Sequence, residues 1–324
     1  MERARMDDFR PAYVSIHLTN RCDARCLHCR IWRNPVENEL DAETLCRAVR
    51  DIGAWLGPME LKIAGGEPLL SPNLKPLVRC ALEAGLDPTI NTNGFSLSGE
   101  LAHELAVMGL DHIVLSLDGF DHVHNKLRCR PDAFPLAERA ITHATDNGMK
   151  VFVNCVICRE NIEILQGFVT WVRDNPRLSG IFFQALMQPF GEEPRDNWWV
   201  DSPLFPDDPD RVAEVLGELL NMKRAGFPIL NEDAQFPVLI DYFRHPGTIA
   251  MGRCNVGNFG LTIEGAGVVK FCGRYEPIGN LFAGKGIVEI ATGKQARRVR
   301  AEMANCRKNC HLLINCCFDE SAVE

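Results

Sequence analysis

The stretch NRCDARCLHCR, residues 20–30, holds three cysteines in the spacing CxxxCxxC: Cys22, Cys26 and Cys29. It directly follows YVSIHLTN, an apolar run with the alternation expected of a β-strand. Three thiolates on one loop can ligate three corners of an iron–sulfur cluster and leave the fourth iron open to another molecule. A structural zinc site would instead be closed by a fourth ligand, which His28 could supply. The segment favours a cluster with an open iron, and zinc is the alternative.

Strand-like runs and longer helical patterns alternate outward from this stretch as far as residue 186. The strand-like runs are YVSIHL, MELKIAG, DPTINTNG, DHIVLSLDG, MKVFVNCVI and SGIFFQAL. Five segments with helical periodicity separate these six runs, and glycines follow three of them as expected helix caps: Gly85, Gly109 and Gly148. Repeated βα units imply a parallel sheet or barrel with right-handed crossovers. We therefore expect an α/β fold in which the carboxyl ends of the strands share one edge.

Polar or glycine-rich motifs lie at the ends of the later strands, as the cysteine segment does at the end of the first. They are AGGEP at 64–68, NTNG at 91–94, SLDG at 116–119, Asn154 and Gln184. Barrel enzymes place their chemistry at the carboxyl ends of the strands. We therefore expect the cysteine segment and these motifs to form one site.

This order of motifs resembles the radical SAM superfamily, in which CxxxCxxC follows the first strand of a partial (β/α)6 TIM-like barrel. The resemblance covers about residues 13–190. It implies that Cys22, Cys26 and Cys29 bind a [4Fe–4S] cluster and that S-adenosyl-L-methionine (SAM) chelates the open iron. It also implies a radical SAM enzyme of the oxidoreductase type, in which reductive cleavage of SAM gives a 5′-deoxyadenosyl radical that abstracts a substrate hydrogen. One departure is His28, where the superfamily usually has an aromatic residue.

The resemblance further implies which residues bind SAM. They are Gly65, Gly66, Glu67, Pro68, Asn93, Ser116, Asp118, Asn154 and Gln184. In the GGEP element the backbone approaches the SAM amino group, and glycine is needed where backbone must come that close. The residues that act on the substrate itself stay unassigned.

The βα pattern ends at Leu186 in a stretch rich in Pro, Asp and Trp, which predicts a long loop before a helix at about residues 209–225. Farther on, GNFGLTIEGAGVVKFCG predicts a hairpin with EGAG at its turn, and TGKQARRVRAEMAN predicts a helix. We expect a radical SAM partial barrel over residues 1–190, a linker of loop and helices over 191–250, and a small α+β domain over 251–324.

A second group of cysteines lies in this last region. Cys254 and Cys272 bracket the expected hairpin, and four more crowd the tail: Cys306, Cys310, Cys316 and Cys317. The group resembles the Twitch domain, the shortened form of the SPASM extension, which implies an auxiliary [4Fe–4S] cluster. We favour Cys254, Cys272, Cys310 and Cys316 as its ligands, with Cys306 as the main rival. Four thiolates would suit a zinc ion equally well by number.

The 324 residues are 46% hydrophobic and 24% charged, with a net charge of −8. Nucleic-acid binding needs a positive face, so this balance argues against it as the main function. No apolar run approaches the roughly 20 residues of a membrane helix, and the polar start lacks the apolar core of a signal peptide. We therefore expect a cytoplasmic protein with no nucleic-acid or membrane partner.

Fourteen cysteines are many for such a protein, since a reducing cytoplasm disfavours structural disulfides. Cys46 and Cys80 lie within apolar helical patterns, where we expect them to pack as free thiols. Cys129, Cys155 and Cys158 are interpreted as mostly structural. Arg128 is interpreted as a surface residue, and the pair Trp198 and Trp199 as packing, with a wall of the substrate pocket as the alternative.

Substrate and partners are the least determined part of the prediction. An auxiliary cluster can accept an electron from a substrate radical, which favours net oxidation. The chain begins almost at the first strand, without the peptide-recognition domain common in peptide-modifying relatives. We therefore expect a small-molecule substrate, such as a sugar or a cofactor or natural-product precursor. A peptide-modifying maturase is the alternative, and a non-catalytic SAM-binding or iron–sulfur electron carrier is the alternative of another class.

The resemblance also implies an electron donor, flavodoxin or ferredoxin, and both are acidic proteins. Six basic residues lie between positions 294 and 308 against the single acid Glu302: Lys294, Arg297, Arg298, Arg300, Arg307 and Lys308. A solvated helix face is the ordinary explanation of such a segment, and a docking site for the donor is the alternative.

Overall fold

The computed structural model describes residues 9–248, 254–310 and 312–318. The first eight residues, discussed above as the start of the chain, and the expected domain boundary at 250/251 lie outside these ranges. No helix within them is both long and apolar enough to cross a membrane.

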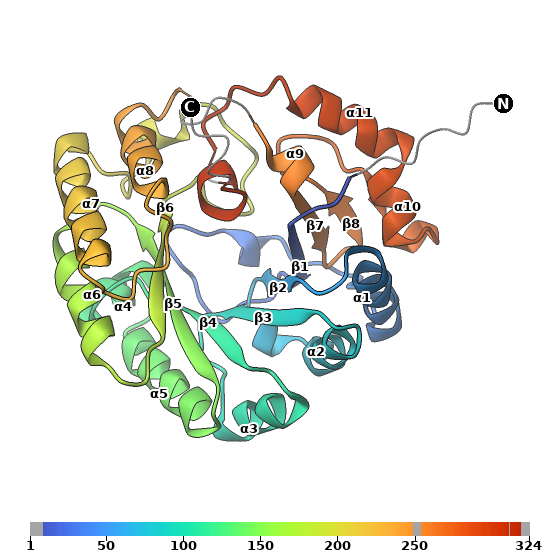
Figure 1. Ribbon diagram of the computed structural model, residues 1–324, viewed down its shortest axis with the longest axis horizontal. Coiled ribbons are helices and arrows are strands. Elements are labelled where there is room, and N and C mark those ends of the chain that lie inside the picture. The colour runs from blue at the N-terminus through green and yellow to red at the C-terminus, as the bar shows by residue number, and fades with distance from the viewer. Residues whose placement is uncertain (1–8, 249–253, 311, 319–324) are drawn as a thin grey trace.

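The core of the fold is a curved parallel sheet with helices on its outer side (Figure 1). Its strands are β1 (Tyr13–Thr19), β2 (Glu60–Gly65), β3 (Asp87–Thr92), β4 (His112–Ser116), β5 (Lys150–Ile157) and β6 (Gly180–Ala185). Consecutive strands pair in parallel, in the order of the chain. This confirms the expected α/β fold and is consistent with a partial TIM barrel.

The expected crossover helices are all present. They are α1 (Ala42–Leu56), α2 (Leu74–Glu83), α3 (Gly99–Met108), α5 (Ala133–Asp146) and α6 (Leu165–Asp174). Asp41 and Ser98 cap α1 and α3, because their side chains accept the backbone N–H groups of Thr44 and Leu101 in the first turn. Gly109 ends α3 with φ 105°, a left-handed conformation that favours glycine.

One helix of the barrel, α4 (Asp121–Arg128), was not expected from the sequence. Its buried residues are Val123, His124, Leu127 and Arg128, so half of its inner face is polar. The apolar repeat that predicts a helix is therefore missing.

The C-terminal part continues the same sheet. β7 (Gly260–Glu264) pairs in parallel with β1, β8 (Val268–Lys270) returns antiparallel, and β9 (Gly279–Asn280) follows, so the full order is β6-β5-β4-β3-β2-β1-β7-β8-β9. The β7–β8 hairpin confirms the predicted one. The remaining helices are α7 (Pro209–Arg224), α8 (Gln235–Arg244), α9 (Val256–Phe259), α10 (Ile287–Thr292) and α11 (Lys294–Met303).

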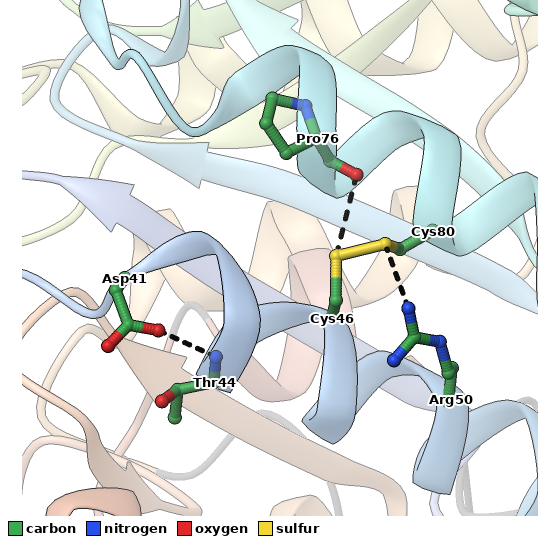
Figure 2. Close-up of a disulfide and its surroundings, with 6 residues drawn as sticks. All are labelled: Asp41, Thr44, Cys46, Arg50, Pro76 and Cys80. Carbon is green, nitrogen blue, oxygen red and sulfur yellow. Dashed lines mark hydrogen bonds between the residues drawn. A yellow bond between two sulfur atoms is a disulfide. The ribbon is translucent and has the colours of Figure 1, made fainter.

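A disulfide joins Cys46 of α1 to Cys80 of α2 (Figure 2). The expectation that these cysteines pack as free thiols is therefore wrong. Both lie on the buried apolar faces of their helices, and packing of the two helices places the Cα atoms 5.5 Å apart. That separation lies within the range a disulfide needs.

Candidate functional site

The cysteine segment leaves β1 and is held by the loop that follows β2. Gly66 N–H donates to the Thr19 carbonyl at 2.7 Å, and Glu67 N–H donates to the Arg21 carbonyl at 2.8 Å. An added Cβ on Gly66 would lie 2.3 Å from the Arg21 carbonyl oxygen. The close approach that requires glycine here is therefore made by the cysteine segment itself, whereas the sequence suggested SAM as the reason.

A single side chain holds the turn of the segment. Nη1 of Arg30 donates to the carbonyls of Cys26, Leu27 and Cys29, each at 3.0 Å. Fixing these three carbonyls within residues 26–29 orients the backbone between the second and third cysteines.

The three thiols lie in a small apolar cluster. Its buried residues are Ala24, Cys26, Phe95, Ala133 and Leu136, and Cys22 and Cys29 pack against it. Burial raises the pKa of the Cys22 thiol to about 12 and also raises the pKa of Cys26 and Cys29. Thiolates here therefore need a cation, and an iron–sulfur cluster would provide it. The donor set thus fits such a cluster.

Among the residues that the structure describes, no group of three or more His, Cys, Asp or Glu side chains is arranged to hold a metal ion. A cluster binds its thiolates to different irons, so the thiols need not converge on one point. A zinc ion requires such convergence. Neither cysteine group shows that convergence in the described residues.

Glu67 joins the ends of β2 and β3 from a fully buried position. Its carboxylate accepts from the Thr92 hydroxyl at 2.7 Å and from two backbone N–H groups, those of Leu69 at 3.0 Å and Asn93 at 2.8 Å. Burial raises the pKa of Glu67 to about 7, although these donors oppose the shift. The carboxylate is therefore bonded to groups of the protein itself, and it stabilises the loop that follows β2. The next residue, Pro68, is also buried and begins a short 3-10 turn at Pro68–Leu70.

Asn93, at the end of β3, contacts the cysteine segment. Its Nδ2 donates to Asp23 Oδ1 at 2.7 Å and lies 4.0 Å from Sγ of Cys22. The hydroxyl of Ser96 donates to Asp23 Oδ2 at 2.8 Å. The motifs after β2 and β3 thus both meet the segment after β1, as the order of strands predicts.

Asp118 follows the end of β4 and is fully buried. Other groups of the protein contact its carboxylate. Its Oδ1 accepts Val156 N–H at 3.1 Å, and its Oδ2 lies 2.7 Å from Nη2 of Arg128. Burial favours the neutral acid, but the Arg128 guanidinium outweighs it and holds the pKa of Asp118 far below its usual range. The interpretation of Arg128 as a surface residue is wrong, because the whole of α4 was missed.

Three predicted SAM-binding residues lie on neighbouring strands with side chains on the inner face of the sheet. They are Ser116 on β4, Asn154 on β5 and Gln184 on β6. Nδ2 of Asn154 donates to Oε1 of Gln184 at 3.2 Å, while Oδ1 of Asn154 is buried without a hydrogen-bond partner. Nε2 of His124 and Nε of Arg128 are likewise buried and unpartnered. Unpartnered buried polar atoms at this mouth fit a site for a polar cofactor.

The second cysteine group is brought together in part. Cys254 lies beside Cys306, and Cys272 lies near both. Cys316 instead lies beside Tyr13 of β1, and Cys317 is buried with its Sγ against Gly260. The structure thus groups Cys306, the rival in the sequence prediction, with Cys254 and Cys272, and directs Cys316 toward the barrel.

A cavity of about 490 Å³ lies between the barrel and the C-terminal strands. Its wall includes Asn20 and Ile31 from either end of the cysteine segment, and Cys272, Cys310 and Cys316 from the second group. This volume falls in the range of ligand pockets, roughly 300–1,000 Å³. Trp198 also lines the cavity and packs against Trp199, so one of the two tryptophans is part of the wall.

One corner of the cavity is polar and charged, and it is formed by His17, Glu264 and Lys270. The sequence did not single out these residues. They come from β1, β7 and β8, and Glu264 is ion-paired with Lys270. Desolvation lowers the pKa of His17 to about 4, with Glu264 opposing and Lys270 reinforcing the shift. His17 is therefore neutral at pH 7. The pairing of β7 with β1 creates this corner, and nothing in a local sequence pattern reveals it.

A model of the Radical SAM superfamily matches residues 16–172. The chain is 32% identical over 148 residues to Fe-coproporphyrin III synthase of Methanosarcina barkeri, covering 45% of this chain and 37% of the relative. It is 35% identical over 157 residues to PqqA peptide cyclase of Streptomyces rochei, covering 47% of this chain and 42% of the relative. The chain therefore spans less than half the length of these two curated relatives.

Two solved structures share the fold over nearly the whole chain. A structure of anSMEcpe with bound AdoMet and the Cp18Cys peptide has a TM-score of 0.68 at 17% identity, covering 95% of this chain and 88% of that one. Streptococcus suis SuiB bound to precursor peptide SuiA has a TM-score of 0.67 at 16% identity, covering 95% and 71%. At such identities the likeness establishes the fold alone.

Proposed function

Residues 16–172 belong to the radical SAM superfamily, and from this premise we propose that the protein is a radical SAM enzyme that modifies a peptide. The cofactors are SAM and a [4Fe–4S] cluster held by Cys22, Cys26 and Cys29. Together they supply, when bound, a 5′-deoxyadenosyl radical that removes a hydrogen atom from the substrate. The residues of this chain bind, orient and shield these groups from water.

The observation that carries the proposal is the cavity lined by thiols of the second cysteine group. Asn20 and Ile31, which flank the first group in the chain, belong to the same wall, so a substrate there would lie near both groups. His17 presents a neutral imidazole to this cavity, which can hydrogen-bond a polar group of the substrate. The enzyme would act in this cavity rather than on the surface.

A peptide substrate is favoured by the relatives. PqqA peptide cyclase is a close relative in sequence, and the two structural neighbours were solved with peptides. These findings favour the peptide alternative over the small molecule expected from the sequence. Oxidation of a small molecule is the second candidate, supported by the likeness to Fe-coproporphyrin III synthase.

For the second cysteine group we propose an auxiliary [4Fe–4S] cluster. Cys254, Cys272 and Cys306 are its best-supported ligands because their side chains lie near one another. We take Cys310, which lines the cavity as Cys272 does, as the fourth. Cys316 also lines the cavity but is the weaker candidate, because its thiol lies beside Tyr13 of β1. Such a cluster can accept the electron that remains after hydrogen abstraction.

Anaerobic reconstitution followed by incubation with dithionite and SAM tests the enzyme assignment. We expect about eight iron and eight sulfide per chain, the content of two [4Fe–4S] clusters, and release of 5′-deoxyadenosine. Changing Cys22, Cys26 and Cys29 to Ala should leave about four iron and abolish that release. An electron carrier or SAM-binding protein would bind its cluster without forming 5′-deoxyadenosine.

Peptides encoded beside the gene then test the substrate class. A peptide substrate should lose about two mass units per crosslink or oxidation and should carry deuterium into 5′-deoxyadenosine when it is deuterated. Turnover of small molecules alone would favour the second candidate.

A further inference from the structure

Arg128 contacts one of the three thiols from a position in which only 6% of its surface is exposed. Its Nη1 donates to Sγ of Cys26 at 3.6 Å, and its Nη2 lies 2.7 Å from Oδ2 of Asp118. The guanidinium is thus fixed between a carboxylate and a cysteine sulfur. The ion pair with Asp118 does not by itself require the guanidinium to contact the Cys26 sulfur as well.

The backbone fixes the same contact independently. Leu27 N–H donates to the Leu127 carbonyl at 2.9 Å, so the residues next to Cys26 and Arg128 are themselves joined. Asp118 is held by Val156 N–H, and its own N–H donates to Nδ1 of His124 at 3.2 Å. These bonds hold both neighbours of the guanidinium, the Cys26 sulfur and the Asp118 carboxylate, in place around it.

We propose that Arg128 is a positioning residue that sets how readily the cluster at Cys22, Cys26 and Cys29 accepts an electron. The inference rests on the proposed function in that these cysteines must hold the cluster. Reduction adds negative charge to a cluster, and a cation that hydrogen-bonds a ligand sulfur stabilises the reduced form more than the oxidised form. Asp118 carries the opposite charge and therefore acts in the opposite sense.

A redox titration followed by electron paramagnetic resonance tests this on the reconstituted full chain. The midpoint potential is taken from the part of the signal that changes when SAM is added, which identifies the SAM-binding cluster. Arg128→Gln should lower the ratio of reduced to oxidised cluster about tenfold at a fixed applied potential, or about 59 mV for a one-electron couple. Arg128→Lys should keep most of the wild-type potential, and Asp118→Asn should raise it.

Lys126→Gln is the matched control, because it removes a charge from the same helix. Lys126 is exposed and paired with Glu160 at 2.5 Å, away from the thiols, so its midpoint should match that of the unmodified protein. The opposite signs for Arg128→Gln and Asp118→Asn separate a charge effect from general damage, which would move both variants in one direction.

Three results overturn the inference in variants that retain iron. They are an unchanged midpoint in Arg128→Gln, shifts of the same sign in Arg128→Gln and Asp118→Asn, or an equal shift in Lys126→Gln. If Arg128→Gln loses iron, the other two variants decide: Arg128→Lys should stay near the wild-type midpoint and Asp118→Asn should lie above it, and any other result overturns the inference. Failure of the proposed function is a different result, in which the unmodified protein binds no cluster or releases no 5′-deoxyadenosine.

Discussion

At Gly66 the loop after β2 lies closely against the cysteine segment after β1. A side chain there would collide with the carbonyl of Arg21, one residue before Cys22. We therefore expect Gly66→Val to lower the iron content by about half as well as to impair SAM cleavage. Gly217→Ala is the control, since Gly217 lies in α7 with open space around it. Full iron in Gly66→Val with SAM cleavage lost would show that the contact with SAM matters instead.

Glu67 should make stability depend on pH. Its folded pKa of about 7 lies above its ordinary value of 4.5, so the folded state binds a proton that the unfolded state releases. The resulting stability is complete below about pH 4.5 and is lost as pH rises through 7, up to roughly 3 kcal/mol. Glu67→Gln should remove this part of the decline in unfolding free energy between pH 5 and 8. The exposed Glu43→Gln should retain it, and identical pH profiles for both variants would contradict the assignment.

Among the single elements, α4 is the barrel helix that the sequence did not predict. The strands and the other crossover helices of the barrel follow from their apolar patterns, and the cysteine spacing and strand-end motifs locate the site. α4 buries His124 and Arg128 beside Val123 and Leu127, so its inner face lacks the apolar repeat. The buried charges become favourable only when Asp118 and Cys26 arrive from other segments, and no local pattern can show that.

The disulfide between α1 and α2 gives a prediction for these two helices. It closes a loop with a sequence separation of 34 residues. By the loop-entropy relation, its reduction should lower the free energy of unfolding by about 3–4 kcal/mol. Denaturant unfolding of Cys46→Ala/Cys80→Ala checks this, and alkylation with mass analysis under non-reducing conditions checks that the bond forms. If both cysteines of the unmodified protein are alkylated without reductant, the prediction fails.

Some of the basic side chains in and after α11 are paired with acidic side chains, which the sequence alone did not show. Arg298 pairs with Glu276 and Glu302, and Lys308 pairs with Asp196. If the segment docks flavodoxin, Lys294→Glu/Arg297→Glu should slow flavodoxin-driven SAM cleavage and leave the dithionite-driven rate unchanged. The flavodoxin-driven rate should also fall steeply with added salt. Lys75→Glu, on α2, is the control. Equal rates in all three proteins would leave α11 as an ordinary solvated surface.

For the whole molecule, the continuous sheet makes the C-terminal part necessary to the barrel. β7 covers the edge of β1, the strand that leads into the cysteine segment. A chain ending at residue 248 would expose that edge, and exposed parallel edges pair with other chains. We expect this truncated protein to aggregate on expression, as size-exclusion chromatography would show. A soluble monomer that still binds four iron would contradict this view.

The pairing of β1 with β7 also sets an order for biogenesis. Tyr13 lies opposite Gly260, so β1 acquires its second neighbour only after synthesis has reached β7. Contacts of such long sequence separation form late, because the intervening chain must first be ordered. The cysteine segment is thus synthesised early, but the strand pairing that supports it forms late. Cluster delivery should therefore follow the emergence of β7 from the ribosome, and nascent chains stalled before β7 should take up no iron.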